Sequence, residues 1–282
     1  MEQLYHMIQH IRHYSDFFPD FDFKDVTVEF LQKFERSMLA KGRSITTVGF
    51  YLRSLRTVLN LAKENGTIKP EDYPFGKRKY VLPTGKNIKK ALNIDQIKQV
   101  FSFETTPGTS MDKAKDFWIF SYLCNGINIM DIVHLQWENI QRNTISFERE
   151  KTKRTNRGNP QKIIALRNDH INNIIEKWSN NKSNTSTKDL VFNIIEKHDD
   201  GEVVRRKVQQ FVQTTNKWMK QVGVELGFEF KLTTYVARHS FATILVRSGA
   251  PLAFASQSLG HTNVLTTQKY FAGFDLDAHA EY

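Results

Sequence analysis

A short basic segment, interrupted by glycine and proline, divides the chain into two parts. Residues 76–90 contain two glycines and one proline, and their charged side chains are all basic: Lys77, Arg78, Lys79, Lys86, Lys89 and Lys90. Glycine and proline end helices and strands, and repulsion between like charges keeps such a segment extended in water. The chain has 282 residues, which suits about two domains of ordinary size. We therefore expect residues 76–90 to link a domain at residues 1–75 to a second one at residues 91–282.

The N-terminal part has the periodicity of α-helices. Thr27 is a suitable cap for a helix that runs to Ala40 and stops at Gly42. A second helix is expected from Ser44 to Gly66, because its apolar side chains recur at steps of three and four: Ile45, Val48, Leu52, Leu55, Leu59 and Ala62. Basic side chains occupy its other faces: Arg43, Arg53, Arg56 and Lys63. These either bind phosphates or form an ordinary solvated surface.

The second part begins with helices and continues into a β-hairpin. Asn93 followed by Gln96 is a capping-box pattern, and helices are expected at about residues 112–124 and 129–137. Two strands are then expected around a basic turn, at residues 144–148 and 161–166. From about residue 168 the chain is expected to be mostly helical, with one short apolar stretch at residues 190–192. The predicted fold class is mainly α, with a small antiparallel β-sheet.

The positive charge of the chain is concentrated in two segments. The formal net charge is +10, yet residues 1–75 are neutral overall. Residues 76–90 and residues 141–167 each carry a net charge of +6. Clustered charge of this kind is typical of a polyanion-binding protein, although basic loops that only face solvent remain the alternative.

Other classes of protein fit poorly. No apolar run approaches the roughly 20 residues that a membrane-spanning helix needs, and the N-terminus lacks the apolar core of a signal peptide. The single cysteine, Cys124, lies in an apolar stretch and is expected to be a buried thiol in a cytoplasmic protein. His6, His10 and His13 have helical spacing, but the nearby sequence does not complete a metal site.

Near the C-terminus, an arginine, a histidine and a tyrosine stand in short motifs. Arg238 begins the string Arg-His-Ser-Phe-Ala-Thr, His261 ends Leu-Gly-His, and Tyr270 ends Thr-Thr-x-x-Tyr. A tyrosine oxygen can attack a phosphodiester while cations hold the negative charge that grows on the non-bridging oxygens. The arginine fork can contact two of these oxygens at once. Such a site needs neither a metal nor a nucleotide.

This constellation resembles the C-terminal signature of tyrosine recombinases, the phage-integrase family, in a form similar to mobile-element integrases of the Bacteroides group. The resemblance is closest over the last 50 residues, and the first domain looks like the family's helical, SAM-like core-binding domain. It implies a site-specific DNA recombinase that cleaves and rejoins strands through a 3′-phosphotyrosine at Tyr270, without a cofactor. The implied partners are double-stranded DNA and, on DNA, a homotetramer, with a monomer as the alternative in solution. The implied location is the bacterial cytoplasm, with the protein associated with the nucleoid.

The resemblance also implies roles for individual residues. Arg238 and His261 would hold the scissile phosphate, and a lysine at the turn of the first hairpin of the catalytic domain would give a proton to the leaving oxygen. Lys151 is the matching residue, with Lys153 next to it. A larger set is expected to bind the DNA backbone: Arg43, Arg53, Arg56, Lys77, Arg78, Lys79, Lys89, Lys90, Lys153 and Arg154. The tail, residues 272–282, would pack on a neighbouring subunit. The arm-binding domain that many family members carry is not evident, so we expect a minimal recombinase or part of a longer chain.

Two positions depart from the family pattern. Asn128 stands where the family usually has its first catalytic arginine, and its amide can donate hydrogen bonds but brings no charge. Tyr235 stands where the motif normally has histidine. His239 does not fill that gap, since the family often has a histidine directly after its arginine.

These departures leave two questions open. The missing charge could come from another arginine, and the sequence does not rank Arg149, Arg154 and Arg247. The departures also favour an alternative function, a catalytically silent DNA-binding protein that kept the fold. A type IB topoisomerase shares the tyrosine chemistry, but it fits the short chain and its separate helical N-terminal domain poorly.

Overall fold

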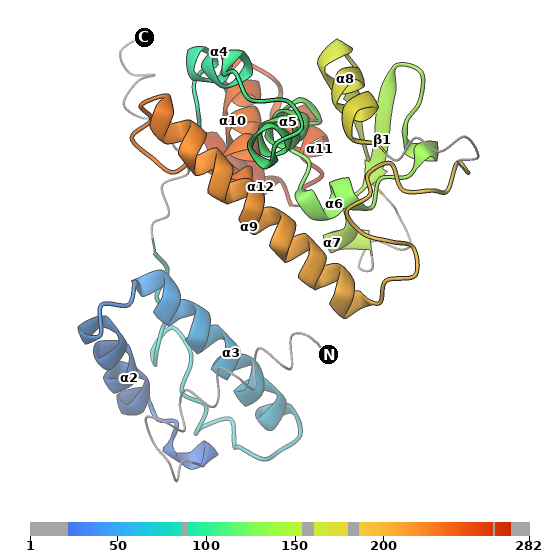
Figure 1. The fold of residues 1–282 in the computed structure, drawn as a ribbon. Coiled ribbons are helices and arrows are strands. Elements are labelled where there is room, and N and C mark those ends of the chain that lie inside the picture. Colours follow the sequence, from blue (N-terminus) through green and yellow to red (C-terminus); the bar gives the residue numbers. More distant parts are fainter. Residues whose placement is uncertain (1–21, 86–89, 154–160, 180–185, 262, 272–282) are drawn as a thin grey trace. The chain divides into compact units, whose positions relative to one another are not determined.

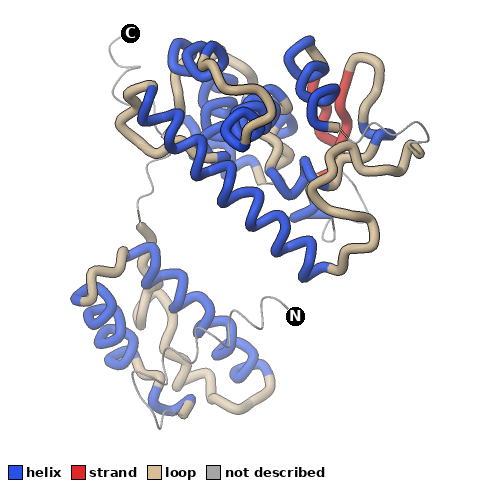
Figure 2. Tube along the Cα trace, in the orientation of Figure 1, coloured by secondary structure: helices blue, strands red, loops and turns tan. Residues whose placement is uncertain are grey.

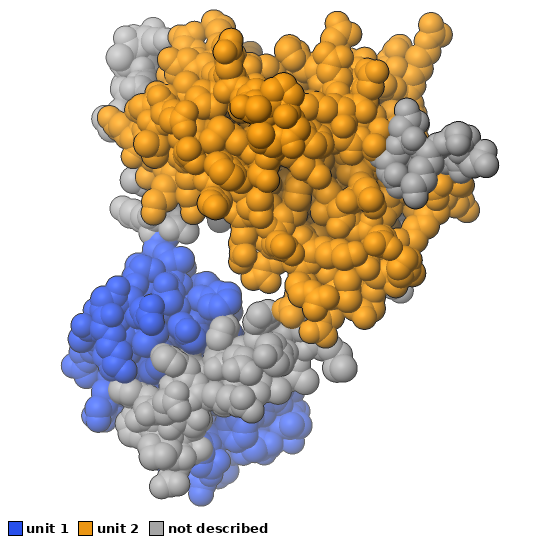
Figure 3. All heavy atoms as spheres, viewed as in Figure 1, with its two compact units in different colours: residues 1–88 blue, residues 89–282 orange. Residues whose placement is uncertain are grey.

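The computed structural model describes residues 22–85, 90–153, 161–179, 186–261 and 263–271 (Figure 1). The chain forms two compact units, residues 1–88 and residues 89–282 (Figure 3). Helices dominate both units, and the strands of the described residues form one hairpin (Figure 2). The expected fold class, mainly α with a small antiparallel sheet, is confirmed.

The first unit is helical, and its helices begin and end where the sequence indicates. After the short 3-10 helix η1 (Phe23–Asp25), α2 spans Val28–Ala40 and α3 spans Ile45–Glu64. The Thr27 hydroxyl accepts a hydrogen bond at the start of α2, and the Ser44 hydroxyl does the same for α3. The apolar stripe of α3 faces α2 and is buried in the core of the unit. The basic side chains that share α3 or flank it, Arg43, Arg53 and Arg56, are exposed.

Residues 76–85 differ from the extended linker that their charge predicts. Tyr80 is buried in the first unit, and its hydroxyl donates to the carboxylate of Glu35. The carbonyl oxygen of Pro83 lies so close to α3 that a Cβ added to Gly49 would be 2.4 Å from it. Apolar packing therefore outweighs charge repulsion here, and this stretch belongs to the first unit.

The second unit follows the predicted order of elements. Its elements are α4 (Ile94–Ser102), α5 (Ser110–Leu123), α6 (Ile129–Val133), η2 (Trp137–Asn139), β1 (Thr144–Glu148), α7 (Glu150–Lys153), β2 (Lys162–Leu166), α8 (Asp169–Trp178), α9 (Gly201–Glu225), α10 (Thr234–Arg247), α11 (Leu252–Ser258) and α12 (Val264–Phe271). The capping box of Asn93 and Gln96 is present. β1 and β2 pair antiparallel, with Thr144 opposite Leu166.

The helix predicted at residues 129–137 is shorter than expected. α6 ends at Val133 because the chain beyond it pairs with a distant segment instead of continuing the helix. The backbone N–H of Val191 donates to Leu135, and that of Trp137 donates to Asp189. Segments so far apart in sequence leave no local signal for where α6 stops.

α5 is the central helix of the second unit (Figure 1). Trp118 and its neighbours Phe117 and Phe120 are fully buried, and the helix packs against α8, α9 and α10. The indole N–H of Trp118 donates to the Thr233 carbonyl at 3.0 Å, which fixes the start of α10. Cys124, directly after α5, is a buried free thiol as predicted. Among the described residues, no helix has both the length and the apolar character that a membrane span requires.

Candidate active site

Arg238 is the buried cation around which the site is built. Its side chain comes from α10 and is 5% exposed. One terminal nitrogen donates to the Gly126 carbonyl at 2.8 Å, and the other donates to the Leu259 carbonyl at 2.5 Å. Gly126 has a φ of +68°, and an added Cβ would be 2.8 Å from the Cα of Arg238, so only glycine fits. Burial, together with the charge of Arg149, lowers the pKa of Arg238 to about 10, so this guanidinium is still charged at neutral pH.

His261 and Tyr270 lie beside this guanidinium. The Nε2 atom of His261 is 3.2 Å from a terminal nitrogen of Arg238, and its Nδ1 atom is 2.8 Å from the Thr267 hydroxyl. Because the guanidinium is only a donor, Nε2 of His261 is the acceptor and Nδ1 carries the proton. The imidazole stacks on the Tyr270 ring, with centroids 6.3 Å apart and planes 15° from parallel. The structure therefore brings together the arginine, histidine and tyrosine of the three C-terminal motifs.

The Tyr270 hydroxyl also contacts a residue that the sequence reasoning set aside. Tyr270 is 7% exposed, and its oxygen lies 3.0 Å from Nδ1 of His239. Burial raises the pKa of Tyr270, while the positive charge of Arg238 pulls it down. Tyr235, which replaces the usual histidine, is 60% exposed, and its ring meets the His239 ring edge-on at 4.5 Å between centroids. His239 thus lies between the two tyrosines.

Of the three arginines considered for the missing charge, Arg149 lies close enough to Arg238 to affect its pKa. It follows β1, and its Nη1 atom donates to the Gly260 carbonyl at 3.2 Å, one residue beyond the carbonyl that binds Arg238. Its Nε atom is buried and, among the described atoms, has no hydrogen-bond partner. Asn128 is half-buried at the N-cap of α6, and its side chain makes no capping hydrogen bond. Of the other candidates, Arg247 is exposed at the end of α10, and Arg154 lies outside the described residues.

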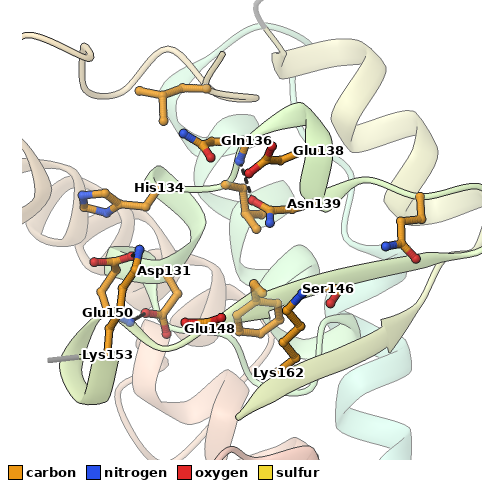
Figure 4. Close-up of a pocket in the computed structure, with 14 residues that line it drawn as sticks. Asp131, His134, Gln136, Glu138, Asn139, Ser146, Glu148, Glu150, Lys153 and Lys162 are labelled. Atoms are coloured by element: carbon orange, nitrogen blue, oxygen red, sulfur yellow. Dashed lines mark hydrogen bonds and ion pairs between the residues drawn. The ribbon is translucent and has the colours of Figure 1, made fainter. Parts of the chain in front are cut away.

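Asp131 is the buried carboxylate next to these cations. It is 5% exposed, and its Oδ1 atom accepts a hydrogen bond from the Glu150 backbone N–H at 2.9 Å. Burial raises the pKa of Asp131, while that hydrogen bond and the charges of Arg149 and Arg238 pull it down. Asp131 also lines a separate cavity of about 360 Å³ (Figure 4). Glu138, Glu148 and Glu150 are among that cavity's other lining residues, and this many carboxylates do not suit a phosphate.

The two hairpin lysines lie on α7, in the connection between β1 and β2. Lys151 is exposed, and Lys153 forms an ion pair with Glu150 at 2.9 Å. The structure also describes several of the residues expected to bind DNA, and these are exposed: Arg43, Arg53, Arg56, Lys77, Arg78, Lys79, Lys90 and Lys153. Lys89 and Arg154 lie outside the described residues, as do His6, His10 and His13 and the tail at residues 272–282.

Sequence comparison assigns both units to one family. The family model described as the Phage integrase family matches residues 90–275, and the one described as the Phage integrase SAM-like domain matches residues 1–80. The chain belongs to the phage integrase family. Among relatives, the tyrosine recombinase XerD of Staphylococcus haemolyticus (strain JCSC1435) is 25% identical over 236 residues, or 83% of this chain and 74% of the relative. XerD of Staphylococcus aureus (strain N315) is 24% identical over 235 residues, with the same coverage of both chains.

Solved structures of integrases share the fold. A lambda integrase dimer bound to a COC′ core site has a TM-score of 0.62 at 15% identity, covering 96% of this chain and 88% of its own. The Tn1549 transposon integrase in complex with transposon right end DNA has a TM-score of 0.60 at 17% identity, covering 91% and 84%. At such identities the likeness is one of fold, and the chemistry has to be argued from the side chains.

Proposed function

We propose that this integrase is a site-specific DNA recombinase in which Tyr270 is the nucleophile. The Tyr270 oxygen attacks the scissile phosphorus, the bond from phosphorus to the 5′ oxygen breaks, and a 3′-phosphotyrosine forms. Rejoining reverses these steps with a new 5′ hydroxyl, so the ester keeps the bond energy. The single observation that carries this proposal is the buried contact of Arg238 with His261, whose ring stacks on Tyr270. A buried cation and an imidazole beside one phenol are what attack on a phosphodiester requires.

We further propose that Arg149 supplies the positive charge that Asn128 lacks. Among the described residues, Arg238 and Asp131 are buried here, and Arg149 is half-buried with a buried Nε atom. Two cations held close together in a low dielectric repel each other, and an entering phosphate relieves this repulsion. Arg238 and Arg149 bond to the consecutive carbonyls of Leu259 and Gly260, so one loop holds both.

The proton for the leaving 5′ oxygen is assigned to Lys151. This lysine is exposed on α7, only two residues along the chain from Arg149. A flexible lysine at that place can reach an oxygen on the DNA and donate to it. Asn128 and Tyr235 are proposed as neutral hydrogen-bond donors to the same phosphate.

The partner is proposed to be double-stranded DNA. The exposed basic residues of the first unit, with Lys90 and Lys153 of the second, would contact phosphates, which gives affinity and salt dependence with little sequence information. The relatives include tyrosine recombinases, and the structural neighbours include integrases in complex with DNA. Four active sites on two DNA sites would form a homotetramer, and the proposed setting is integration of a mobile element in the cytoplasm.

Covalent selection tests this proposal. A pool of duplexes with a randomised core, each nicked within the core, is incubated with the protein, and detergent-resistant adducts are amplified over several rounds. After cleavage, the short fragment between the cleavage site and the nick diffuses away, so the strand cannot be rejoined and the covalent adduct accumulates. We expect selected duplexes to form an adduct with the wild type and none with Tyr270→Phe. Sequence-specific binding without any adduct would support the silent DNA-binding protein instead.

A further inference from the structure

We propose that His239 is the general base that takes the proton from Tyr270. This inference rests on the proposed function, since it concerns the same nucleophile. The geometry that carries it is the distance of 3.0 Å between Nδ1 of His239 and the Tyr270 oxygen. Both side chains are buried, with 8% and 7% of their surface exposed. Hydrogen-bond contact with the proton to be removed is the first requirement for a base.

The nucleophile needs such a partner. A buried phenol is a poorer source of phenoxide than one in water, because burial disfavours the charged form, and burial raises the pKa of Tyr270. Arg238 offsets this only in part, because its guanidinium is already bonded to the carbonyls of Gly126 and Leu259. A neutral imidazole accepts a proton near neutral pH, which a carbonyl or a hydroxyl does not.

The other titratable side chains beside Tyr270 that could be considered as the base, His261 and Tyr235, are less suited to take its proton. His261 accepts from Arg238 through Nε2 and donates to Thr267 through Nδ1, so both of its ring nitrogens already have a role. Tyr235 is a phenol, which does not accept a proton at neutral pH. It packs edge-on against His239 from the preceding turn of α10, which holds the imidazole plane in place. His239 is therefore the base that the described geometry presents to the nucleophile.

The proton balance follows from this arrangement. As the Tyr270 oxygen bonds to phosphorus, its proton moves to Nδ1 of His239, and the 5′ oxygen leaves with a proton from Lys151. During rejoining, a 5′ hydroxyl gives its proton to Lys151 as its oxygen attacks the phosphotyrosine, and the released Tyr270 oxygen regains its proton from His239. The two proton transfers occur on opposite sides of the phosphorus, so they can be tested separately.

Two substitutions of His239 distinguish a general base, which takes up the proton of Tyr270, from a residue that only positions the Tyr270 side chain. The amide of His239→Asn can still hydrogen-bond to the Tyr270 hydroxyl but takes up no proton, whereas His239→Phe loses both abilities. We expect both to slow single-turnover adduct formation on a selected duplex by at least about 10²-fold, a typical contribution of a general base. DNA affinity and the thermal unfolding midpoint should stay close to the wild type, and the exposed His170 provides the control His170→Asn, which should cleave normally.

A duplex with sulfur in place of the bridging 5′ oxygen shows whether a variant is impaired in protonating the leaving group or in deprotonating Tyr270. A leaving thiolate needs no proton, so this substrate should restore cleavage by Lys151→Ala and leave His239→Asn slow. Wild-type rates for His239→Asn, or its rescue by the sulfur substrate, would overturn the inference while leaving the proposed function intact. Failure of the wild type to form any adduct would instead overturn the proposed function.

If neither variant folds, the wild type with the sulfur substrate still provides a test. Its cleavage rate should fall as pH falls through the titration of a histidine, about 6.5 when unperturbed. Among the described residues, Tyr235 and Tyr270 contact the His239 ring, and Arg238 and His261 lie beside Tyr270. The phenols and the guanidinium do not titrate in this range. A rate that is flat between about pH 5.5 and 8 would overturn the inference.

Discussion

Gly260 is the position where one added methyl group should disturb both cations at once. It has a φ of +60°, and its carbonyl accepts the hydrogen bond from Arg149. A Cβ built at this position would be 2.4 Å from Cδ1 of Ile163 and 2.9 Å from Cδ of Arg149. Carbon atoms pack at about 3.5–4.0 Å, so Gly260→Ala forces the loop, Ile163 or Arg149 to move by roughly 1 Å.

The cost has two parts. A side chain in the left-handed region costs about 1–2 kcal/mol, and overpacking a core by one methyl group costs about 1–3 kcal/mol. We therefore expect Gly260→Ala to lower the free energy of unfolding by about 2–5 kcal/mol. Misplacing catalytic groups by about 1 Å can cost on the order of 10²-fold in rate. Cleavage should fall by about that factor even at temperatures where the variant is fully folded.

Gly227→Ala provides the matched control. Gly227 has a φ of +73°, and among the described atoms nothing lies within 4 Å of an added Cβ. This control should show the backbone cost alone, about 1–2 kcal/mol, and an unchanged cleavage rate. Urea denaturation gives the stabilities, and single-turnover adduct formation gives the rates. If the two variants lose equal stability and cleave equally fast, the proposed packing of Gly260 against Arg149 is wrong.

The remaining predictions concern the cation, the fold and the DNA. Arg149→Ala should slow single-turnover cleavage by about 10²–10³-fold, with Arg149→Lys intermediate; a normal rate for the alanine variant would show that the charge comes from elsewhere. Burial alone would raise the pKa of Asp112, but hydrogen bonds from Lys177 and other donors lower it below the ordinary value. That contribution to stability is present above the unfolded pKa and is lost as pH falls through the folded pKa. Lys177→Met should therefore cost about 2 kcal/mol at neutral pH, a figure reduced for the partial exposure of Lys177. The cost should shrink progressively as pH falls below about 3.9, the unfolded value of aspartate, measured by urea denaturation; a cost independent of pH would contradict this. Replacing Arg53 and Arg56 by alanine should each lower the slope of log affinity against log salt by about 1, and an unchanged slope would remove that residue from the interface.

Local signals predicted much of the fold. Thr27 and Ser44 cap their helices as expected, and the hairpin strands pair where alternation indicates. Prediction was wrong where a contact distant in sequence decided the outcome. Burial of Tyr80 ties residues 76–85 to the first unit in spite of their charge, and pairing with residues 189–191 ends α6 early.

In the candidate site, too, the sequence predicted the residues that stand in local motifs and missed a contact between distant segments. Arg238, His261 and Tyr270 stand in recognisable motifs, so the sequence pointed to them. His239 was set aside because the family often has a histidine directly after its arginine. Its contact with Tyr270 joins two helices, α10 and α12, which no local pattern reports. A signal did exist for Arg149. It lies two residues beyond the buried Phe147 and directly after β1, so continuing the alternation of the strand predicts a side chain on the buried face.

The central claim is that the Tyr270 oxygen becomes bonded to DNA phosphorus. Its most direct test is to digest the adduct formed on a selected nicked duplex and to locate the attached nucleotide by mass spectrometry. We predict a single modified peptide, with the nucleotide on Tyr270 and linked through its 3′ phosphate. A nucleotide on any other residue, or an adduct that persists in Tyr270→Phe, would contradict the account.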